Sequence, residues 1–415
     1  MLSEFFDSAL RIQALRAGPA GAFFEGFAQA LSQGGYAEIT ARRHIRAAEH
    51  FIYWRDRQGL ALRDLTEGSL ERFDRHLRRC RCPRYGHAHR LDVLHGARVF
   101  LGHLQEVGAI AVAAVEPSAH DPALLRAFRQ WMRQQRGTCE GTVDNYAIHI
   151  RKLLRDLGEE PERFDARSLR QFVLEASRAS GWAAAKKCTT ALRMFLRFLI
   201  AEGRCASGLA AAIPVLAHWR LAVLPRYLQE EDVERLIESC DRRSPVGRRD
   251  RAILLLLARL GLRAGDVVQM RLCDVDWKGA WIHVCGKGRR PTRLPLTKEV
   301  GQALVAYLKD GRPQTQSDAV FIRSRAPFQP FRSHCAVSVI VGAALRRAGV
   351  KRPSRGAAHL LRHSVATSML RHGASLQEVA ALLRHRSIET TQIYAKVDVT
   401  ALRKIVQPWP EVQSC

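Results

Sequence analysis

The stretch from Arg355 to Lys396 gathers residues whose types and spacing suit chemistry on a phosphate. His359 and Arg362 lie three residues apart in a helical pattern, so their side chains share one helix face. His385 follows a second helix, and Tyr394 comes nine residues after it. Arginine can hold phosphodiester oxygens, histidine can transfer a proton near neutral pH, and a tyrosine hydroxyl can attack phosphorus and store the broken bond as an ester.

Two earlier residues would complete this set: Arg263 in GLRAGD and Lys287 in CGKGRR. Each has an ordinary interpretation, because Arg263 could cap a helix or pair with Asp266, and Lys287 could decorate a turn. Together they supply a second guanidinium for the transition-state charge and an acid for a leaving 5′-oxygen. The region has no obvious acidic triad for magnesium, so we predict phosphoryl transfer with no metal and no cofactor.

The elements that must position these residues read as mainly helical. RRDRAILLLLARLGL is apolar enough to be a central helix and ends at Gly261. Three β-like runs follow, VVQMRLCDVDW, AWIHVCGK and TRLPLT, and place Lys287 at a hairpin tip. Ser375 and Glu378 form a capping box before His385, and Ser387 can cap the helix that carries Tyr394. We predict a mainly α fold with helical N-terminal bundles, followed by a mixed α+β catalytic domain with one small antiparallel three-stranded sheet.

The N-terminal half contains two similar segments. TARRHIRAAEHFIYWRD, LTEGSLERFDRHL and GARVFLGHLQEVG are followed, in the same order, by TVDNYAIHIRKLLRDLG, FDARSLRQFVLEA and ALRMFLRFLIAEG. This order indicates a duplicated helical module, although small amphipathic bundles also resemble one another by chance. At 415 residues the chain is long enough for two or three domains. We predict helical domains over 1–115 and 120–205, a linker over 206–223, a catalytic domain over 224–400 and a tail over 401–415.

The charge of the chain indicates a polyanionic partner. Lys+Arg number 66 against 40 for Asp+Glu, a net charge of +26, which favours nucleic acid even if codon bias explains part of the arginine content. Basic residues on the polar faces of the bundles and in the hairpin are candidates for contacts with the DNA backbone, although such runs are often only solvated. These candidates are Arg42, Arg43, Arg151, Lys152, Lys186, Lys187, Arg289 and Arg290.

The cysteines and the hydropathy point to a cytoplasmic protein. Most of the ten cysteines are scattered singly rather than in a disulfide framework. CRCPRYGHAH could hold zinc through Cys80, Cys82, His87 and His89. A C-x-C spacing is awkward for tetrahedral zinc, so we favour a basic loop and predict no metal. The longest apolar run falls far short of the ~20 residues that a membrane span needs, and no secretory leader is visible.

The six candidate residues also follow the order of a known family. The segment from about Leu224 to Thr400 resembles the tyrosine recombinases, also called the phage integrase family. The hallmarks of that family are an arginine after a G-L-R turn, a hairpin lysine, H-x-x-R, a second histidine and then the tyrosine. The matching residues here are Arg263, Lys287, His359, Arg362, His385 and Tyr394.

Two positions depart from the family pattern. Leu383-Arg384-His385 replaces the usual L-G-H, and Asp266, a second-shell candidate, stands where glutamate is usual. Neither change removes a group with a chemical role. They leave open whether Arg384 contacts DNA or extends a helix into the turn.

The resemblance implies an N-terminal helical domain that closes a clamp around DNA. We expect the segment 120–205 to be this clamp and 1–115 to be an additional arm. It also implies a C-terminal tail that packs on a neighbouring subunit, whose apolar anchors here would be Leu402, Ile405 and Val406. The partners that it implies are double-stranded DNA recombination sites, a tetramer formed on DNA and co-encoded recombinases.

The resulting functional hypothesis is a site-specific DNA recombinase of integrase or transposase type. Tyr394 would form a 3′-phosphotyrosyl link, and strand exchange would pass through a Holliday junction. Alternatives are a type IB topoisomerase, which rejoins the same strand, and a non-catalytic DNA-binding protein; a metal-dependent nuclease is a weaker one. The doubled N-terminal region favours a mobile element over housekeeping resolution of chromosomes.

Overall fold

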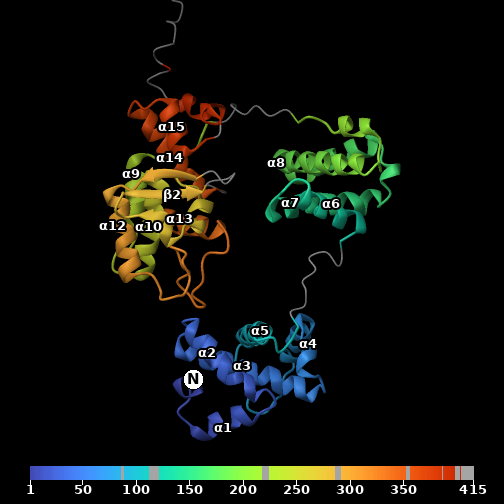
Figure 1. Ribbon diagram of the computed structural model, residues 1–415, viewed down its shortest axis with the longest axis vertical. Coiled ribbons are helices and arrows are strands. Elements are labelled where there is room, and N and C mark those ends of the chain that lie inside the picture. Colours follow the sequence, from blue (N-terminus) through green and yellow to red (C-terminus); the bar gives the residue numbers. More distant parts are fainter. Residues whose placement is uncertain are drawn as a thin grey trace, which may run out of the picture. The chain divides into compact units, whose positions relative to one another are not determined.

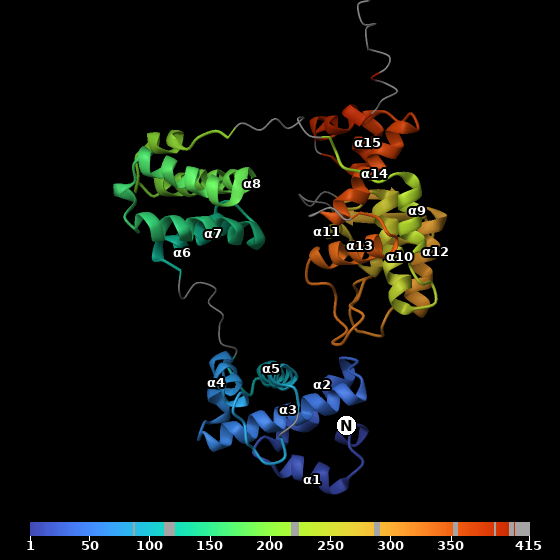
Figure 2. The ribbon, with the colours of Figure 1, turned by 180° about the vertical axis from the view of Figure 1, so that it is seen from behind.

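The computed structural model describes residues 1–85, 88–111, 121–216, 224–285, 291–351, 356–385, 387–397 and 402. Its contacts divide the chain into two units, Val112–Trp219 and the remainder, Met1–Ala111 with Arg220–Cys415. Three large hydrophobic cores are present, one within each N-terminal bundle and one in the C-terminal region. Helices dominate all three regions, and the described residues contain one small sheet (Figures 1 and 2). The predicted fold class is confirmed.

The first bundle is built around α3, which packs against α5. Its hydrophobic core includes Phe27, Phe51, Phe73 and Phe100, all with essentially no exposed surface. The buried face of α5 passes through Val93, and the nearby Leu91 is exposed. Its elements are η1 (Leu2–Glu4), α1 (Ala9–Ala17), α2 (Gly21–Gln33), α3 (Glu38–Arg57), η2 (Leu62–Asp64), α4 (Glu67–Leu77) and α5 (Arg90–Glu106).

The second bundle repeats the order of the first from α2 onwards. It consists of α6 (Ala123–Gln134), α7 (Glu140–Leu157), η3 (Pro161–Arg163), α8 (Ala166–Ala201) and η4 (Ser207–Ala212). Gly181 kinks α8 at φ 77°, so this element is two helices that correspond to α4 and α5. Buried residues correspond as well: Leu65, Leu70 and Phe73 match Phe164, Leu169 and Phe172 at one constant interval in the sequence. This agreement supports the predicted duplication.

The two modules differ in one connection. Phe100 and Phe195 occupy corresponding core positions, but the sequence interval between them is shorter than that between Phe73 and Phe172. The extra residues of the first module lie between α4 and α5, where the second module turns at Gly181. The first module therefore carries a longer loop at this position, residues 78–89.

The C-terminal region surrounds one apolar helix, α10 (Pro245–Leu260), which packs against α9, α12, α13 and α14 (Figure 1). Eight of its residues are buried hydrophobic ones, as expected for a central helix. The other helices here are α9 (Glu230–Glu238), α11 (Ala264–Gln269), η5 (Leu272–Asp274), α12 (Lys298–Asp310), α13 (Cys335–Arg347), α14 (Ala357–Arg371), α15 (Leu376–Leu383), η6 (Ile388–Thr390) and η7 (Gln392–Val397).

The sheet is antiparallel in the order β1-β2-β3, with β1 (Val275–Asp276), β2 (Trp281–Cys285) and β3 (Pro291–Pro295). Expecting a strand over VVQMRLCDVDW was largely wrong, because its first residues belong to α11 and only two form β1. A helix forms there because the Asp266 carboxylate accepts a hydrogen bond from the backbone N–H of Arg263 and so caps the first turn of α11. Cys285 pairs with Pro291, and Lys287, Arg289 and Arg290 lie between them, outside the described residues.

Two further expectations need adjustment. The first part of the predicted linker is η4, which packs on α8 and buries Ile213 in the second bundle. Ser387 caps η6, whereas Tyr394 lies in the following turn, η7, so the predicted single helix is two short 3₁₀ turns. Of the three predicted tail anchors, Ile405 and Val406 lie outside the described residues.

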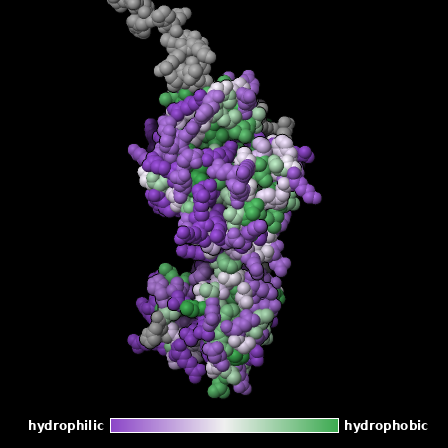
Figure 3. Space-filling view, turned by 90° about the vertical axis from the view of Figure 1, so that its left-hand side faces the viewer, coloured by the Kyte–Doolittle hydropathy of each residue, from purple (hydrophilic) through white to green (hydrophobic). Residues whose placement is uncertain are grey.

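Hydrophilic residues predominate on the face drawn in Figure 3. None of the helices among the described residues is long and apolar enough to cross a membrane.

Gly261 is the residue at which backbone geometry matters most for this region. It ends α10 in the left-handed conformation, at φ 57°, and a Cβ added there would lie 2.7 Å from Cδ2 of Leu383. Only glycine adopts this conformation without strain, and only a missing side chain allows the turn after α15 to approach so closely.

We therefore expect Gly261→Ala to destabilise the C-terminal region by about 1–3 kcal/mol through strain and the Leu383 clash. Gly265→Ala is the matched control, because Gly265 lies in α11 with nothing within 4 Å of an added Cβ. Urea unfolding of both variants measures the difference. Equal stabilities would show that the turn tolerates a side chain.

Candidate active site

Arg362 lies at the centre of the candidate site. It projects from α14 and is 4% exposed. Its guanidinium donates to the backbone carbonyls of Gly261 and Leu383, at the C-terminal ends of α10 and α15. Helix C-termini carry partial negative charge, so they favour a cation there. Across the described residues, no carboxylate comes within ion-pair distance of Arg362. Only the partial charges of the two helix ends therefore oppose its positive charge at close range.

The pKa of Arg362 reflects this arrangement. It falls to about 9, mainly because burial removes the guanidinium from water and secondarily because of the charges of Arg263 and Arg384. An anion bound at this place would relieve both effects. The site is therefore electrostatically prepared for a negatively charged group.

Arg263 is held beside Arg362 by a small polar network. Its backbone N–H donates to Oδ2 of Asp266 at 3.0 Å, and its guanidinium donates to the carbonyl of Arg384 at 3.4 Å. The same Asp266 oxygen accepts from the Arg384 guanidinium at 2.6 Å. Burial lowers the pKa of Arg263, the charge of Asp266 opposes this shift, and the neighbouring Arg384 adds a smaller lowering.

Arg384, which replaces the usual glycine, lies within this network. It ends α15 in the left-handed conformation at φ 52°, where glycine is favoured, and its side chain is 7% exposed. In this structure the guanidinium turns inward to Asp266 rather than toward solvent. Asp266 therefore links the turn between α10 and α11 to the turn after α15.

Tyr394 is packed inside the protein. It is 1% exposed and lies in a small hydrophobic cluster with Leu370, Val379 and Leu383. Its hydroxyl is 2.7 Å from Nδ1 of His363. Burial raises the pKa of this hydroxyl to about 12, although the charge of Arg362 acts in the opposite direction. The phenol is thus protonated in this conformation.

His363 is the residue that sequence reasoning missed. It follows Arg362 directly and lies four residues after His359, with 6.4 Å between the two ring centroids. That i, i+4 spacing places both histidines on one helix face and was the available signal. Burial, then His359 and Arg362, lower the pKa of His363 to about 4, so its ring is neutral near pH 7.

The other two histidines lie at the same site in different surroundings. His385 is half-buried, and its Nδ1 is 2.8 Å from Oγ1 of the buried Thr391. Burial, then the charge of Arg362, lower the pKa of His385 to about 4. His359 is exposed, yet surrounding protein removes enough water from the ring to lower its pKa, and Arg362 adds to this effect.

The structure thus brings together five of the six predicted residues on α11, α14 and the segments after α15. These are Arg263, His359, Arg362, His385 and Tyr394. Lys287, the sixth, lies outside the described residues.

The candidate DNA contacts lie in different surroundings. Arg42 pairs with Glu38 at 2.6 Å and Arg151 with Asp121 at 2.6 Å, so both already have internal partners. Lys152 lies over the ring of Phe172 and Lys186 over that of Trp182. Arg43 and Lys187 are exposed. The last two hairpin candidates, Arg289 and Arg290, are outside the described residues.

Comparisons with known proteins agree with this geometry. Residues 226–400 match the model of the phage integrase family. A putative integrase/recombinase of Sinorhizobium fredii, y4rA, is 36% identical over 95% of this chain and 95% of its own length. The tyrosine recombinase XerD of Listeria monocytogenes serotype 4b is 28% identical and covers 68% of this chain and 96% of its own length.

The chain belongs to the phage integrase family of tyrosine recombinases. Its fold resembles that of lambda integrase residues 75–356, solved as a dimer bound to a core site, with a TM-score of 0.54, 20% identity and coverage of 70% of this chain and 98% of the other. XerH bound to a palindromic difH substrate gives a TM-score of 0.54 at 18% identity, over 68% of this chain and 93% of the other. The predicted enzyme class, a site-specific DNA recombinase, is confirmed.

The lowered histidine pKa values lead to a testable pH dependence. Between about pH 6.5 and 4 the unfolded chain binds protons that the folded His363 and His385 resist, so the free energy of unfolding should fall as the pH falls. One such group changes it by at most about 1.4 kcal/mol per pH unit, and by less when half-buried.

We expect His385→Gln to flatten this dependence relative to the unmodified protein, as measured by urea unfolding at several pH values. His372→Gln is the control, because His372 is exposed at the end of α14. Parallel curves for the unmodified protein and His385→Gln would contradict the assignment.

Proposed function

We propose that this recombinase cuts and rejoins DNA with Tyr394 as the nucleophile. The observation that supports this most is the buried charge of Arg362, which acts on the Tyr394 hydroxyl and has the charge of Arg263 beside it. Two guanidinium groups in that position suit the two non-bridging oxygens of a phosphodiester and the charge that grows in its transition state.

The proposed reaction balances without a metal or an external energy source. The Tyr394 oxygen attacks phosphorus as its proton leaves, and the bond between phosphorus and the 5′-oxygen breaks to give a 3′-phosphotyrosyl ester. His359 accepts the tyrosine proton, and Lys287 protonates the departing oxygen. Arg263, Arg362 and His385 hold the phosphate. The 5′-hydroxyl of a partner strand then attacks the ester and releases Tyr394, and two such exchanges form and resolve a Holliday junction.

The burial of Tyr394 adds a step before this chemistry. A hydroxyl in a hydrophobic cluster, hydrogen-bonded to His363, cannot reach a phosphate in the DNA duplex. We infer that η7 must shift when DNA and neighbouring subunits bind. His363 then acts as a positioning residue that holds the nucleophile in its resting place.

The rest of the chain would bring DNA and partner subunits to this centre. We propose that the second bundle is the DNA clamp and the first an additional arm, and that subunits assemble as a tetramer on recombination sites, with co-encoded recombinases as further partners. Of the candidate backbone contacts, Arg43 and Lys187 are exposed and take part in none of the ion pairs or ring contacts described above. The full-length similarity to y4rA, a putative integrase/recombinase, supports an integrase-type role. We propose, from the doubled N-terminal region, that it serves a mobile element, and that it acts in the cytoplasm.

Tyr394→Phe should abolish covalent trapping on a nicked suicide substrate while leaving DNA binding within about twofold, because only the attacking oxygen is lost. Denaturing gels report the trapped complex, and gel shifts report binding. Tyr227→Phe is the control, since Tyr227 packs against the same hydrophobic cluster but its hydroxyl binds Arg371 rather than His363. A covalent complex that survives in Tyr394→Phe would disprove the assignment.

His363→Phe should expose Tyr394 while leaving cleavage within about tenfold, because a positioning residue does not carry the proton transfer, which is itself worth about 10²–10⁴-fold. Nitration of Tyr394, followed by mass spectrometry, should become several-fold faster than in the unmodified protein. A loss of cleavage of more than a hundredfold, with nitration unchanged, would instead make His363 the base.

A further inference from the structure

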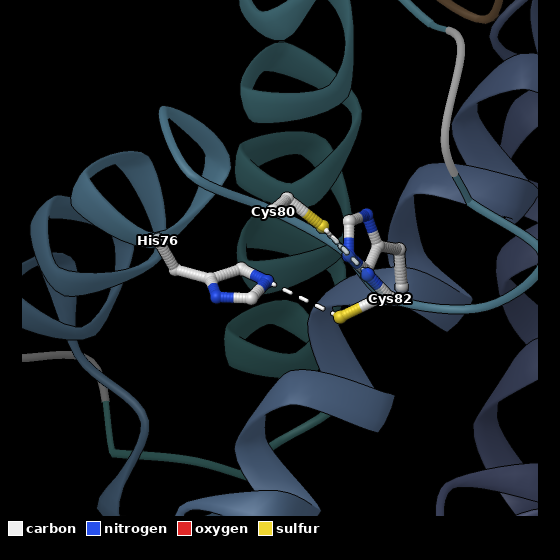
Figure 4. A group of neighbouring side chains, drawn as sticks. His76, Cys80 and Cys82 are labelled. Carbon is white, nitrogen blue, oxygen red and sulfur yellow. Dashed lines mark hydrogen bonds between the residues drawn. The ribbon is translucent and has the colours of Figure 1, made fainter.

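Four metal-ligating side chains meet in the first bundle, far in sequence from the residues of the recombination chemistry. One ligand atom from each lies within 4.8 Å of the other three, and the residues are His50, His76, Cys80 and Cys82. Figure 4 shows His76, Cys80 and Cys82 turned toward a common centre. Sγ of Cys80 is 3.4 Å from Nε2 of His50, and Sγ of Cys82 is 3.4 Å from Nε2 of His76.

These separations suit tetrahedral zinc. With bonds of about 2.3 Å to sulfur and about 2.0–2.1 Å to nitrogen, neighbouring ligand atoms in a tetrahedron lie about 3.3–3.8 Å apart. The two sulfur–nitrogen pairs already meet this range, and the remaining atoms need to approach by an ångström or less. Neither cysteine is in a disulfide. We propose that the first bundle binds one zinc ion through two imidazoles and two thiolates, those of His50, His76, Cys80 and Cys82.

The surroundings of the cluster support such a site. His50 comes from the middle of α3 and is 2% exposed, with its ring stacked on Tyr85 at 4.4 Å and edge-on to Phe73 at 5.2 Å. This packing fixes the ring and keeps water from one side of the centre. The backbone N–H of Cys82 donates to Sγ of Cys80 at 3.4 Å, a contact that stabilises thiolate charge. Two residues of the cluster are thus preorganised as ligands.

The position of the cluster explains why a metal would be needed. It joins α3, the last turn of α4 and the 78–89 loop, the connection that is longer here than in the second module. This loop exposes four arginines and has a left-handed non-glycine residue, Arg84, at φ 80°. The exposed arginines are Arg78, Arg79, Arg81 and Arg84. Such a loop has few apolar side chains to hold it, so a zinc cross-link would replace the missing core.

Four protein ligands leave no open coordination position, so this zinc would be structural rather than catalytic. The inference therefore does not depend on the proposed recombination mechanism. It also revises the sequence-based choice of ligands, in which Cys80 and Cys82 were considered with His87 and His89 and a metal was not favoured. His89 is the exposed N-cap residue of α5, and His87 lies outside the described residues. The C-x-C pair works here because the two histidines come from other helices.

The test measures zinc in the full-length protein, purified without a polyhistidine tag from zinc-supplemented cells and dialysed without chelator. Elemental mass spectrometry should find about one zinc per chain, and the Cys80→Ser/Cys82→Ser variant should retain less than a tenth of it. Cys273→Ser/Cys285→Ser is the matched control, because both of these cysteines are exposed in the catalytic domain; it should keep its zinc.

A spectroscopic measurement on the unmodified chain covers the case in which the double variant fails to fold. Cobalt exchanged for zinc should give the absorption of a tetrahedral ion with sulfur-to-cobalt charge transfer from two thiolates. The proposal is overturned if the unmodified protein holds less than a tenth of a zinc per chain, if the control variant loses zinc equally, or if intact mass shows a Cys80–Cys82 disulfide. Cleavage by Tyr394 is unaffected by any of these results.

Discussion

The structure of the C-terminal region depends on the buried guanidinium of Arg362, which has no carboxylate within ion-pair distance in the described part of the chain. Arg362 donates to the carbonyls of Gly261 and Leu383, so it joins the ends of α10 and α15 and fixes the turns that carry Arg263 and His385. A carboxylate partner would stabilise the free protein more, but it would also cancel the charge that a phosphate requires. Helix C-termini offer a compromise, because their partial charges hold the cation in place without neutralising it.

Asp266, the carboxylate near the charge of Arg362, is bound to other groups. Oδ2 of Asp266 accepts from the backbone N–H of Arg263 and from the guanidinium of Arg384 rather than forming an ion pair with Arg362. Arg384 occupies the position where the family usually has glycine. Its backbone is left-handed, and its side chain forms the ion pair with Asp266. The ion pair with Asp266 offsets part of the charge of Arg384, which still lowers the pKa of Arg362. The substitution thus adds to the turn a cation that Asp266 holds in place.

The sequence allowed the chemistry and the fold class to be predicted because both depend on local patterns. The H-x-x-R spacing, the capping box at Ser375 and the apolar run of α10 each determine a local conformation whatever their surroundings. Long-range contacts were not predictable in the same way. The hydrogen bond between His363 and Tyr394 joins residues on different elements, and the meeting of His50 and His76 with two cysteines depends on the packing of α3 against α4. The strand expected over VVQMRL is not formed, because the helix cap made by the Asp266 side chain outweighed the strand preference of the β-branched residues.

The resting position of Tyr394 follows from the same charge arrangement. A free phenol beside the charge of Arg362 would tend to ionise, since a nearby cation lowers a phenol pKa. Burial in the cluster of Leu370, Val379 and Leu383 outweighs that effect and keeps the pKa near 12. Withdrawing η7 from the cluster would remove the desolvation while leaving the arginines in place, so the pKa of Tyr394 would fall as the hydroxyl becomes accessible. Activation of the nucleophile and its delivery to the phosphate would then be one movement.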